Sequence, residues 1–190
     1  MAAGDSATSI CNIGLIALGE PPLASLADNR KAAIICGARY DQIRREVLRS
    51  YVWNCAKKQA QLAAAANAPP FTYANAYPLP PDFIRMVDLP ENDEAAWEVV
   101  GPNLLTDEGS PLDVLYGFDL IDPTKFDPLL STIIGLAMAV DLCEPLTGSL
   151  AKRDRVLAMI EGKLNAGRLA SSQENSSREF DEDVWLRKRP

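Results

Sequence analysis

Carboxylates are the side chains in this sequence that could most readily do chemistry. Adjacent pairs occur at Asp93–Glu94 and Asp107–Glu108, and glycosidases use two carboxylates as acid and as base or nucleophile. Carboxylates next to each other on a turn are ordinarily just solvated. Histidine is absent from the 190 residues, which removes the Ser-His-Asp and Cys-His arrangements and histidine metal ligands. We therefore expect that the chain is not an enzyme.

Cysteines and aspartates offer little support for a metal or cofactor site. Four cysteines lie far apart with no CxxC pair, in stretches of helical character, so buried reduced thiols are favoured over zinc or disulfide bonds. Asp119, Asp122 and Asp127 lack the spacing and the glycine of an EF-hand loop. Asp127 before Pro128 instead matches a helix N-cap followed by proline. No cofactor is expected. The cysteines are Cys11, Cys36, Cys55 and Cys143.

Charge is distributed unevenly along the chain. The net charge is −7. Residues 82–144 hold two basic and fourteen acidic side chains, a net of −12, whereas residues 1–81 carry +3 and residues 145–190 carry +2. An acidic surface repels nucleic-acid phosphates. The same charges could simply keep the protein in solution.

Apolar periodicity predicts four helices that would position these groups. The first ends at Gly19 and is capped by Ser6 or Thr8. The second, 30–52, follows Asp28 as N-cap and has one apolar side. The third, about 128–144, is apolar nearly all round, as a central buried helix is, and Pro145 and Gly148 are expected to end or kink it. The fourth, about 150–170, is capped by Ser149, and its predicted apolar stripe is Leu150, Leu157, Ile160 and Leu164.

Two finer expectations concern the second helix. Asp41 and Arg45 lie at i and i+4 and predict an ion pair on its polar side. Trp53, just after the helix, is expected to anchor the core, with stacking on a ligand as the alternative. The predicted apolar stripe is Ala33, Cys36, Tyr40, Ile43, Val47 and Tyr51.

The middle of the chain predicts strands. An alanine-rich stretch, 60–66, runs into Pro69 and Pro70, which exclude a continuing helix. Alternating apolar residues and turn residues then predict a small antiparallel sheet. Its expected strands are 73–77, 83–89, 97–100, 103–106 and 112–116.

The fold class expected is therefore α+β, a bundle of about four helices with a small antiparallel β subdomain inserted between the second and third. The helical body comprises residues 1–68 and 119–170, the β subdomain residues 69–118, and an extended C-terminal arm residues 171–190. Serines in this arm cannot build a core. Its apolar residues would be buried only against a neighbouring subunit or partner, the alternative being a free tail. The expected partner-interface residues are Phe180, Val184, Trp185, Leu186 and Arg187.

Targeting and membrane signals are weak. The longest apolar runs, such as residues 133–140, are shorter than the roughly 20 residues of a membrane span. The first residues lack a signal peptide's basic start and apolar core, with Asp5 where that core would begin. We expect synthesis in the cytoplasm and no membrane partner.

Three segments, in this order, carry the most specific signal. The first segment is ALGEPPL (17–23), in which a helix ends at glycine and the chain turns at two prolines. The second is VLRSYVWNCAK (47–57), in which a helix leads into an aromatic anchor. The third is YPLPPDFIR (77–85), in which the chain enters a strand through prolines. Over roughly residues 8–170 the chain resembles the tail tubular protein A family of phage head-to-tail adaptors.

The resemblance implies a structural virion protein. Such adaptors form a ring, usually of twelve copies, beneath the portal protein and above a tail tube or nozzle protein. The ring lies at the head–tail junction, is assembled in the host bacterial cytoplasm, and leaves a channel through which double-stranded DNA passes without specific binding. Acidic candidates for lining that channel are Asp82, Asp88, Glu98, Asp107 and Asp113.

Two other classes of function stay open at this point. The first is a cytosolic helical regulator that binds a partner through the C-terminal arm and stays a monomer or dimer. The second is a carboxylate-dependent enzyme with a concave pocket. Its residues would be Asp113, Asp119 or Asp122.

Overall fold

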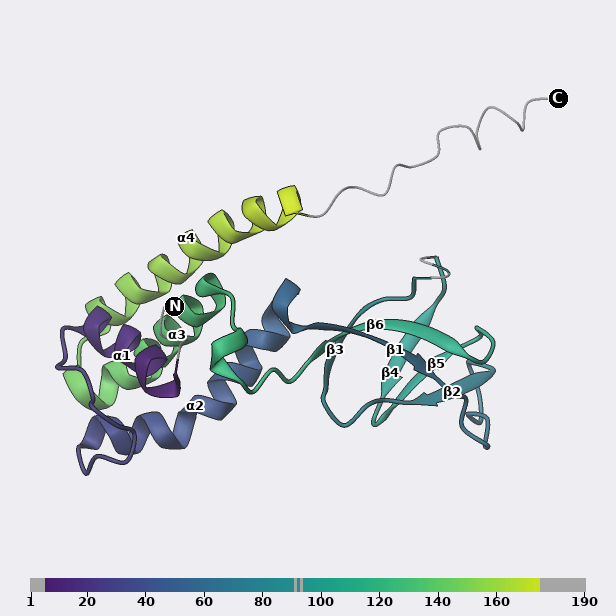
Figure 1. Ribbon diagram of the computed structural model, residues 1–190, viewed down its shortest axis with the longest axis horizontal. Coiled ribbons are helices and arrows are strands. Elements are labelled where there is room, and N and C mark those ends of the chain that lie inside the picture. Colours follow the sequence, from purple (N-terminus) through teal and green to yellow (C-terminus); the bar gives the residue numbers. More distant parts are fainter. Residues whose placement is uncertain (1–5, 91, 93, 175–190) are drawn as a thin grey trace.

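The computed structural model describes residues 6–90, 92 and 94–174, with side chains as far as residue 165. Four helices and two antiparallel three-stranded sheets make the fold α+β, as predicted. The helices form a body at one end of the molecule and the sheets form the other end, with α2 (Lys31–Ser50) leading toward them (Figure 1). The predicted arm beyond residue 174 lies outside the described residues.

Helix α1 (Ala7–Leu18) begins and ends as the sequence predicts. The Ser6 hydroxyl accepts a hydrogen bond from the Ser9 amide at 3.0 Å, and the Ser9 hydroxyl accepts one from the Ser6 amide at 2.8 Å. This reciprocal capping satisfies two amides that lack a partner within the helix. Gly19 ends the helix at φ 77°, in the left-handed region that suits glycine.

Helix α2 has the predicted apolar stripe but not the predicted cap. Its five stripe residues from Ala33 to Val47 are buried, and Tyr51 lies just beyond the helix. Arg30 is the N-cap and offers no side-chain hydrogen bond. The Asp28 carboxylate instead accepts from the Ser25 amide at 3.4 Å within the preceding turn, so the prediction of Asp28 as N-cap is wrong.

Helix α3 (Pro128–Thr147) begins as expected and ends later. Asp127 caps it by accepting from the Leu129 amide at 2.7 Å. The helix passes through Pro145, beyond the expected residue 144, and ends at Gly148 (φ 60°), the second of the two residues expected to end or kink it. A proline in the last turn removes only one helical hydrogen bond. In addition, Lys31 Nζ donates to the Pro145 carbonyl at 2.6 Å.

Helix α4 (Leu150–Glu174) confirms two of the four predicted stripe residues, Ile160 and Leu164. Val156 is buried, and Ile160 and Leu164 pack beside it, which places the apolar contacts at four-residue steps. Leu150 and Leu157 are exposed, so their assignment to the stripe is wrong. The helix also continues past residue 170, where we expected the arm to begin.

The centre of the helical body is α3, which packs against α1, α2 and α4. Gly14 of α1 lies directly against Gly135 of α3: a Cβ on Gly14 would stand 2.4 Å from the Gly135 carbonyl oxygen. By length and composition alone α3 could cross a membrane. Its burial among the other helices accounts equally well for that composition, as predicted for a central helix.

The strands form two sheets instead of the single one predicted. One sheet has the order β1 (Lys57–Leu62), β6 (Leu112–Phe118), β3 (Phe83–Asp88). The other has the order β2 (Asn75–Pro78), β5 (Asn103–Thr106), β4 (Trp97–Val100). A second core joins them, in which Tyr77 and Leu104 of one sheet pack with Met86, Val114 and Tyr116 of the other.

The position of strand β1 shows that the predicted start of the β subdomain, at residue 69, is wrong. We placed residues 57–62 in the helical body, but they pair along β6, so the strands begin upstream of residue 69. A short 3-10 helix, Asn54–Ala56, joins α2 to β1 beside Trp53. Trp53 is buried, and its indole N–H donates to the Val47 carbonyl at 3.1 Å. The prediction that it anchors the core is confirmed.

Candidate functional site at the joint between helices and sheets

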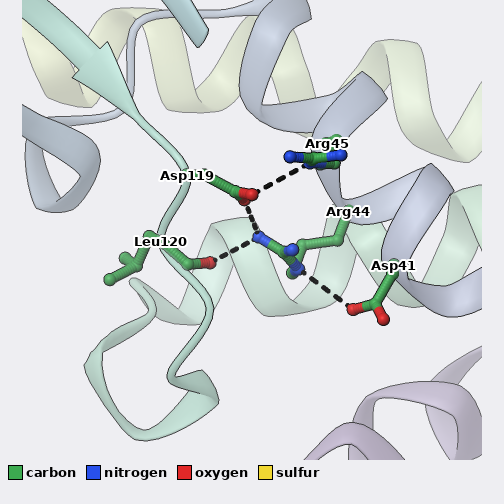
Figure 2. A network of polar contacts seen from close by, with 5 residues as sticks. All are labelled: Asp41, Arg44, Arg45, Asp119 and Leu120. Atoms are coloured by element: carbon green, nitrogen blue, oxygen red, sulfur yellow. Dashed lines mark hydrogen bonds and ion pairs between the residues drawn. The ribbon is translucent and has the colours of Figure 1, made fainter. Parts of the chain in front are cut away.

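A buried arginine marks the place where the helical body meets the β subdomain. The Arg44 side chain on α2 is only 3% exposed. It donates to the Asp119 carboxylate and, at 2.8 Å, to the Leu120 carbonyl, while its Nε lies 3.6 Å from Asp41 (Figure 2). A buried charge is tolerated only when it is paired and hydrogen-bonded. Arg44 therefore fixes the segment that leaves β6.

Asp119 binds two neighbouring arginines of α2. Besides Arg44, it accepts from Arg45 Nε at 2.9 Å through its other oxygen (Figure 2). Burial alone would raise the pKa of this carboxyl, but the hydrogen bonds and charges of the two arginines outweigh it and hold the pKa below its usual value. Arg45 thus pairs with Asp119, and the predicted Asp41–Arg45 ion pair is wrong, because Asp41 lies beside Arg44.

A second polar cluster adjoins the first through the main chain. The Asp119 amide donates to the Asp82 carbonyl at 2.8 Å. The Asp82 carboxylate accepts from Lys58 Nζ at 2.8 Å and from the Tyr116 hydroxyl at 3.0 Å. The Lys58 hydrogen bond is the main cause that holds the pKa of Asp82 below its usual value. These contacts tie together β1, β6 and the start of β3.

The end of α2 is bonded to β3 in both directions. Arg49 donates to the Ile84 carbonyl at 2.8 Å, and Arg85 donates to the Arg49 carbonyl at 3.0 Å. A Cβ on Gly117 of β6 would stand 3.0 Å from the Arg85 side chain, so glycine gives this arginine room. Together with Arg44 and Arg45, these residues form what we call the arginine joint. It comprises Arg44, Arg45, Arg49, Arg85 and Asp119.

The three segments that carry the family resemblance lie at turning points of the fold. In segment 17–23, the Leu23 amide donates to the Asn12 side-chain oxygen at 2.7 Å, and the Asn12 side-chain nitrogen donates to the Leu23 carbonyl at 2.9 Å. Segment 47–57 contains Trp53 and joins α2 to β1. Segment 77–85 joins β2 to β3 and contains Asp82 of the second polar cluster.

The acidic residues singled out from the sequence are not gathered at one place. Asp82 lies near the end of β6, whereas Asp113, near its start, accepts from Gln61 at 2.9 Å. Asp107 accepts from the Ala74 amide at 2.8 Å. Asp88 lies on β3 and Glu98 on β4. Three of the five therefore already serve contacts within the subdomain, and their place relative to a channel stays a prediction.

The C-terminal candidates lie outside the described residues. These are Phe180, Val184, Trp185, Leu186 and Arg187.

The three aspartates of the enzymatic alternative are also dispersed. Asp119 lies in the arginine joint, and Asp122 caps the 3-10 helix Pro123–Lys125 by accepting from the Thr124 amide at 3.1 Å. Asp113 lines two open pockets, of about 340 and 250 Å³. Within the described residues no group of three or more potential metal-binding side chains occurs. The arrangement at the joint is suited to fixing two parts of the chain to each other.

Neither the scan against protein-family models nor the search of curated proteins finds a match to this chain.

Proposed function

We propose that this chain is a head-to-tail adaptor of a phage virion. In this proposal copies assemble as a ring beneath the portal protein, hold the capsid to a tail tube or nozzle protein, and leave a channel for DNA. The observation that carries the proposal is the place of the three resembling segments, each of which lies at a turn or junction between elements. Residues at such junctions set how helices and sheets are oriented, which an adaptor needs.

The arginine joint supports a mechanical role. A connector under load must keep its helical body and its β subdomain in one relative orientation. Arg44 is paired and buried at that boundary, and Arg49 and Arg85 bond the end of α2 to β3. Buried paired charges are costly to separate, so the joint resists bending between the two parts.

The charge distribution gives the ring a way to let DNA pass. In the assembled ring, carboxylates of the β subdomain face the channel and repel the phosphates of the duplex. Glu98 is a candidate for this role, because it is exposed on β4. Mapping carboxylates on an assembled ring tests this part: side chains directed mostly outward would leave them only a solubilising role.

Binding to the portal protein is the property to test first. The full chain is mixed with the portal protein encoded by the same phage genome and sedimented through a gradient, with a portal from an unrelated phage as the control. Co-sedimentation with the cognate portal alone supports the adaptor. A protein that stays a monomer or dimer in both mixtures fits the regulator instead and contradicts the proposal.

A further inference from the structure

We propose that the open edge of β4 is a docking site for an added strand, and that residues 184–189 of a neighbouring copy occupy it. This rests on the proposed ring, because it names the contact by which one copy would hold the next. The sequence of that stretch is VWLRKR. It combines three apolar residues, which could cover the exposed apolar side chains of β4, with three basic ones, which are absent between residues 86 and 124.

Within the residues that the structure describes, strand β4 presents unpaired main-chain groups along one side. It ends at a two-residue turn, Gly101–Pro102, in which the positive φ of Gly101 (59°) suits a type II′ hairpin. Val100 and Asn103 flank this turn and so form its hydrogen-bonded pair. Because bonding alternates along an antiparallel pair, the amides and carbonyls of Val99 and Trp97 point away from β5. An added strand could bond to them.

The outer edges of the other strands are covered or interrupted. Pro78 of β2 has no amide, and the Ala76 carbonyl already accepts from the Ala65 amide at 2.7 Å. Strand β3 contains two register shifts, and β1 begins with Lys57 and Lys58. Prolines, bulges and lysines are the usual protection against edge pairing. Within the described residues, β4 has none of these.

The side chains of β4 are apolar and exposed. Trp97, Val99 and Val100 are 40%, 37% and 47% exposed. A flat apolar edge is the surface to which an extended segment adds, with main-chain bonds providing affinity and side chains providing selectivity. Covering Trp97 and Val99 requires large apolar side chains, which residues 184–186 offer.

The charge around β4 specifies a basic occupant. No lysine or arginine occurs between Arg85 and Lys125 in the sequence, while seven acidic residues lie between 86 and 111. Pairing β4 with β4 of another copy would bring these acidic segments together. Strand β1 is basic, but Lys58 is engaged with Asp82, and β1 has no large exposed apolar side chain. Residues 187–189 are basic and follow the apolar stretch directly.

A head-to-tail contact of this kind suits a ring. The donor segment and the acceptor edge are different surfaces, so each copy can offer one to the next, and such heterologous contacts close into rings when the rotation permits. Α segment tethered to its own folded body also gains from the high effective concentration that an assembled ring provides.

A peptide tests the site without requiring a ring. The peptide spans residues 184–190, which carry the apolar and basic side chains without the acidic residues before them, and is added to the full chain carrying Trp185→Ala and Leu186→Ala, so that the chain's own segment does not compete. Amide hydrogen exchange is followed on β4. We expect slowing of at least tenfold at Trp97 and Val99, whereas Glu98 and Val100, already bonded to β5, serve as internal controls and change little.

Two variants sharpen the test. Val99→Pro removes an outward amide without removing a bond to β5, and should abolish peptide protection. A peptide with Arg187, Lys188 and Arg189 replaced by glutamate should bind at least tenfold more weakly. Unchanged exchange at Trp97 and Val99 with saturating peptide, or equal binding of the charge-reversed peptide, would overturn the docking. Absence of rings on portal would instead contradict the adaptor proposal and leave the peptide result standing.

Discussion

Arg44 is a charged residue that the fold buries for a positional purpose. Its neighbours in the helical register, Tyr40, Ile43 and Val47, are core residues, so its place on the apolar side of α2 can be read from the sequence. Its partner cannot, because Asp119 lies far along the chain and reaches it only once β6 is paired. The sequence instead suggested an ion pair between Asp41 and Arg45, and that prediction was wrong, because Arg45 pairs with Asp119.

Replacing Asp119, the partner of Arg44, should lower the free energy of unfolding far more than replacing the exposed Arg45. Asp119→Asn leaves the buried guanidinium without its countercharge, and we expect a loss of about 3 kcal/mol or more in the free energy of unfolding. Arg45→Ala is the matched control: its side chain is 61% exposed, and we expect a loss within about 1 kcal/mol. Urea unfolding measures both. Equal losses would contradict a buried role for Arg44.

Acid should weaken the joint through the same carboxyl. The pKa of Asp119 is lowered in the folded state, so its contribution to stability is fully present above the ordinary carboxyl pKa of about 4 and is lost as the pH falls through the folded value. The pKa of Asp82 is lowered too. Unfolding free energy should therefore decline below about pH 4, and the decline should be shallower in Asp119→Asn. An identical slope in both proteins would refute this.

Trp53 should behave as a core anchor. Its side chain is 5% exposed, its ring packs edge-on against Tyr51, and its indole N–H is bonded. Trp53→Ala should lower the free energy of unfolding by about 3–5 kcal/mol. The control is Trp97→Ala on the edge of β4: Trp97 is 40% exposed, so its removal should lower the free energy of unfolding by distinctly less than that of Trp53. A shift in melting midpoint of only a degree or two for Trp53→Ala would contradict its anchoring role.

At the scale of elements, the crossing of α1 and α3 depends on glycine. Gly14 and Gly135 lie in direct contact, and a Cβ on either would meet backbone atoms of the other helix at 2.4 or 2.7 Å. Gly14→Ala should therefore destabilise the protein by about 1–3 kcal/mol through overpacking. Gly37→Ala in α2 is the matched control, because nothing lies within 4 Å of its Cβ position. We expect it to stabilise the protein by up to about 1 kcal/mol. Thermal unfolding of both variants should give shifts of opposite sign, and equal shifts would refute the close crossing.

Local signals predicted most elements and missed those set by distant contacts. Capping residues and glycines correctly predicted α1 and the start of α3. The turn residues around β4 and β5 predicted both strands with the limits that the structure has. Strand β1 is rich in lysine, glutamine and alanine, which have low strand propensity. It forms because β6 pairs with it. Two sheets instead of one follow likewise from pairings that no local pattern encodes.

The candidate joint was harder to predict than the elements that build it. Asp82 was chosen from the sequence for its charge, and in the structure that charge is engaged with Lys58 and Tyr116. Arg49, near the end of α2, bonds to a β3 carbonyl that lies 35 residues further along the chain. In both cases the sequence shows the charged residue but does not indicate its partner, because the two are brought together only when the β subdomain packs against the helices.

For the whole molecule, the acidic charge of residues 82–144 bears on how the proposed ring would assemble. The net charge of −12 over residues 82–144 would bring like charges together in a free ring. We therefore expect the isolated protein to be largely monomeric and to assemble mainly on a portal template. Native mass spectrometry at low salt measures this directly. Stable free rings under those conditions would contradict template control.

Electron microscopy of the protein mixed with its cognate portal tests the adaptor proposal most directly. We expect a ring of this protein stacked coaxially on the portal, with the copy number resolved by averaging and an open channel through both. The portal alone is the control for rings of its own. Portal particles that carry no added density at saturating protein, with this chain remaining in solution as a monomer or dimer, would contradict the proposed function.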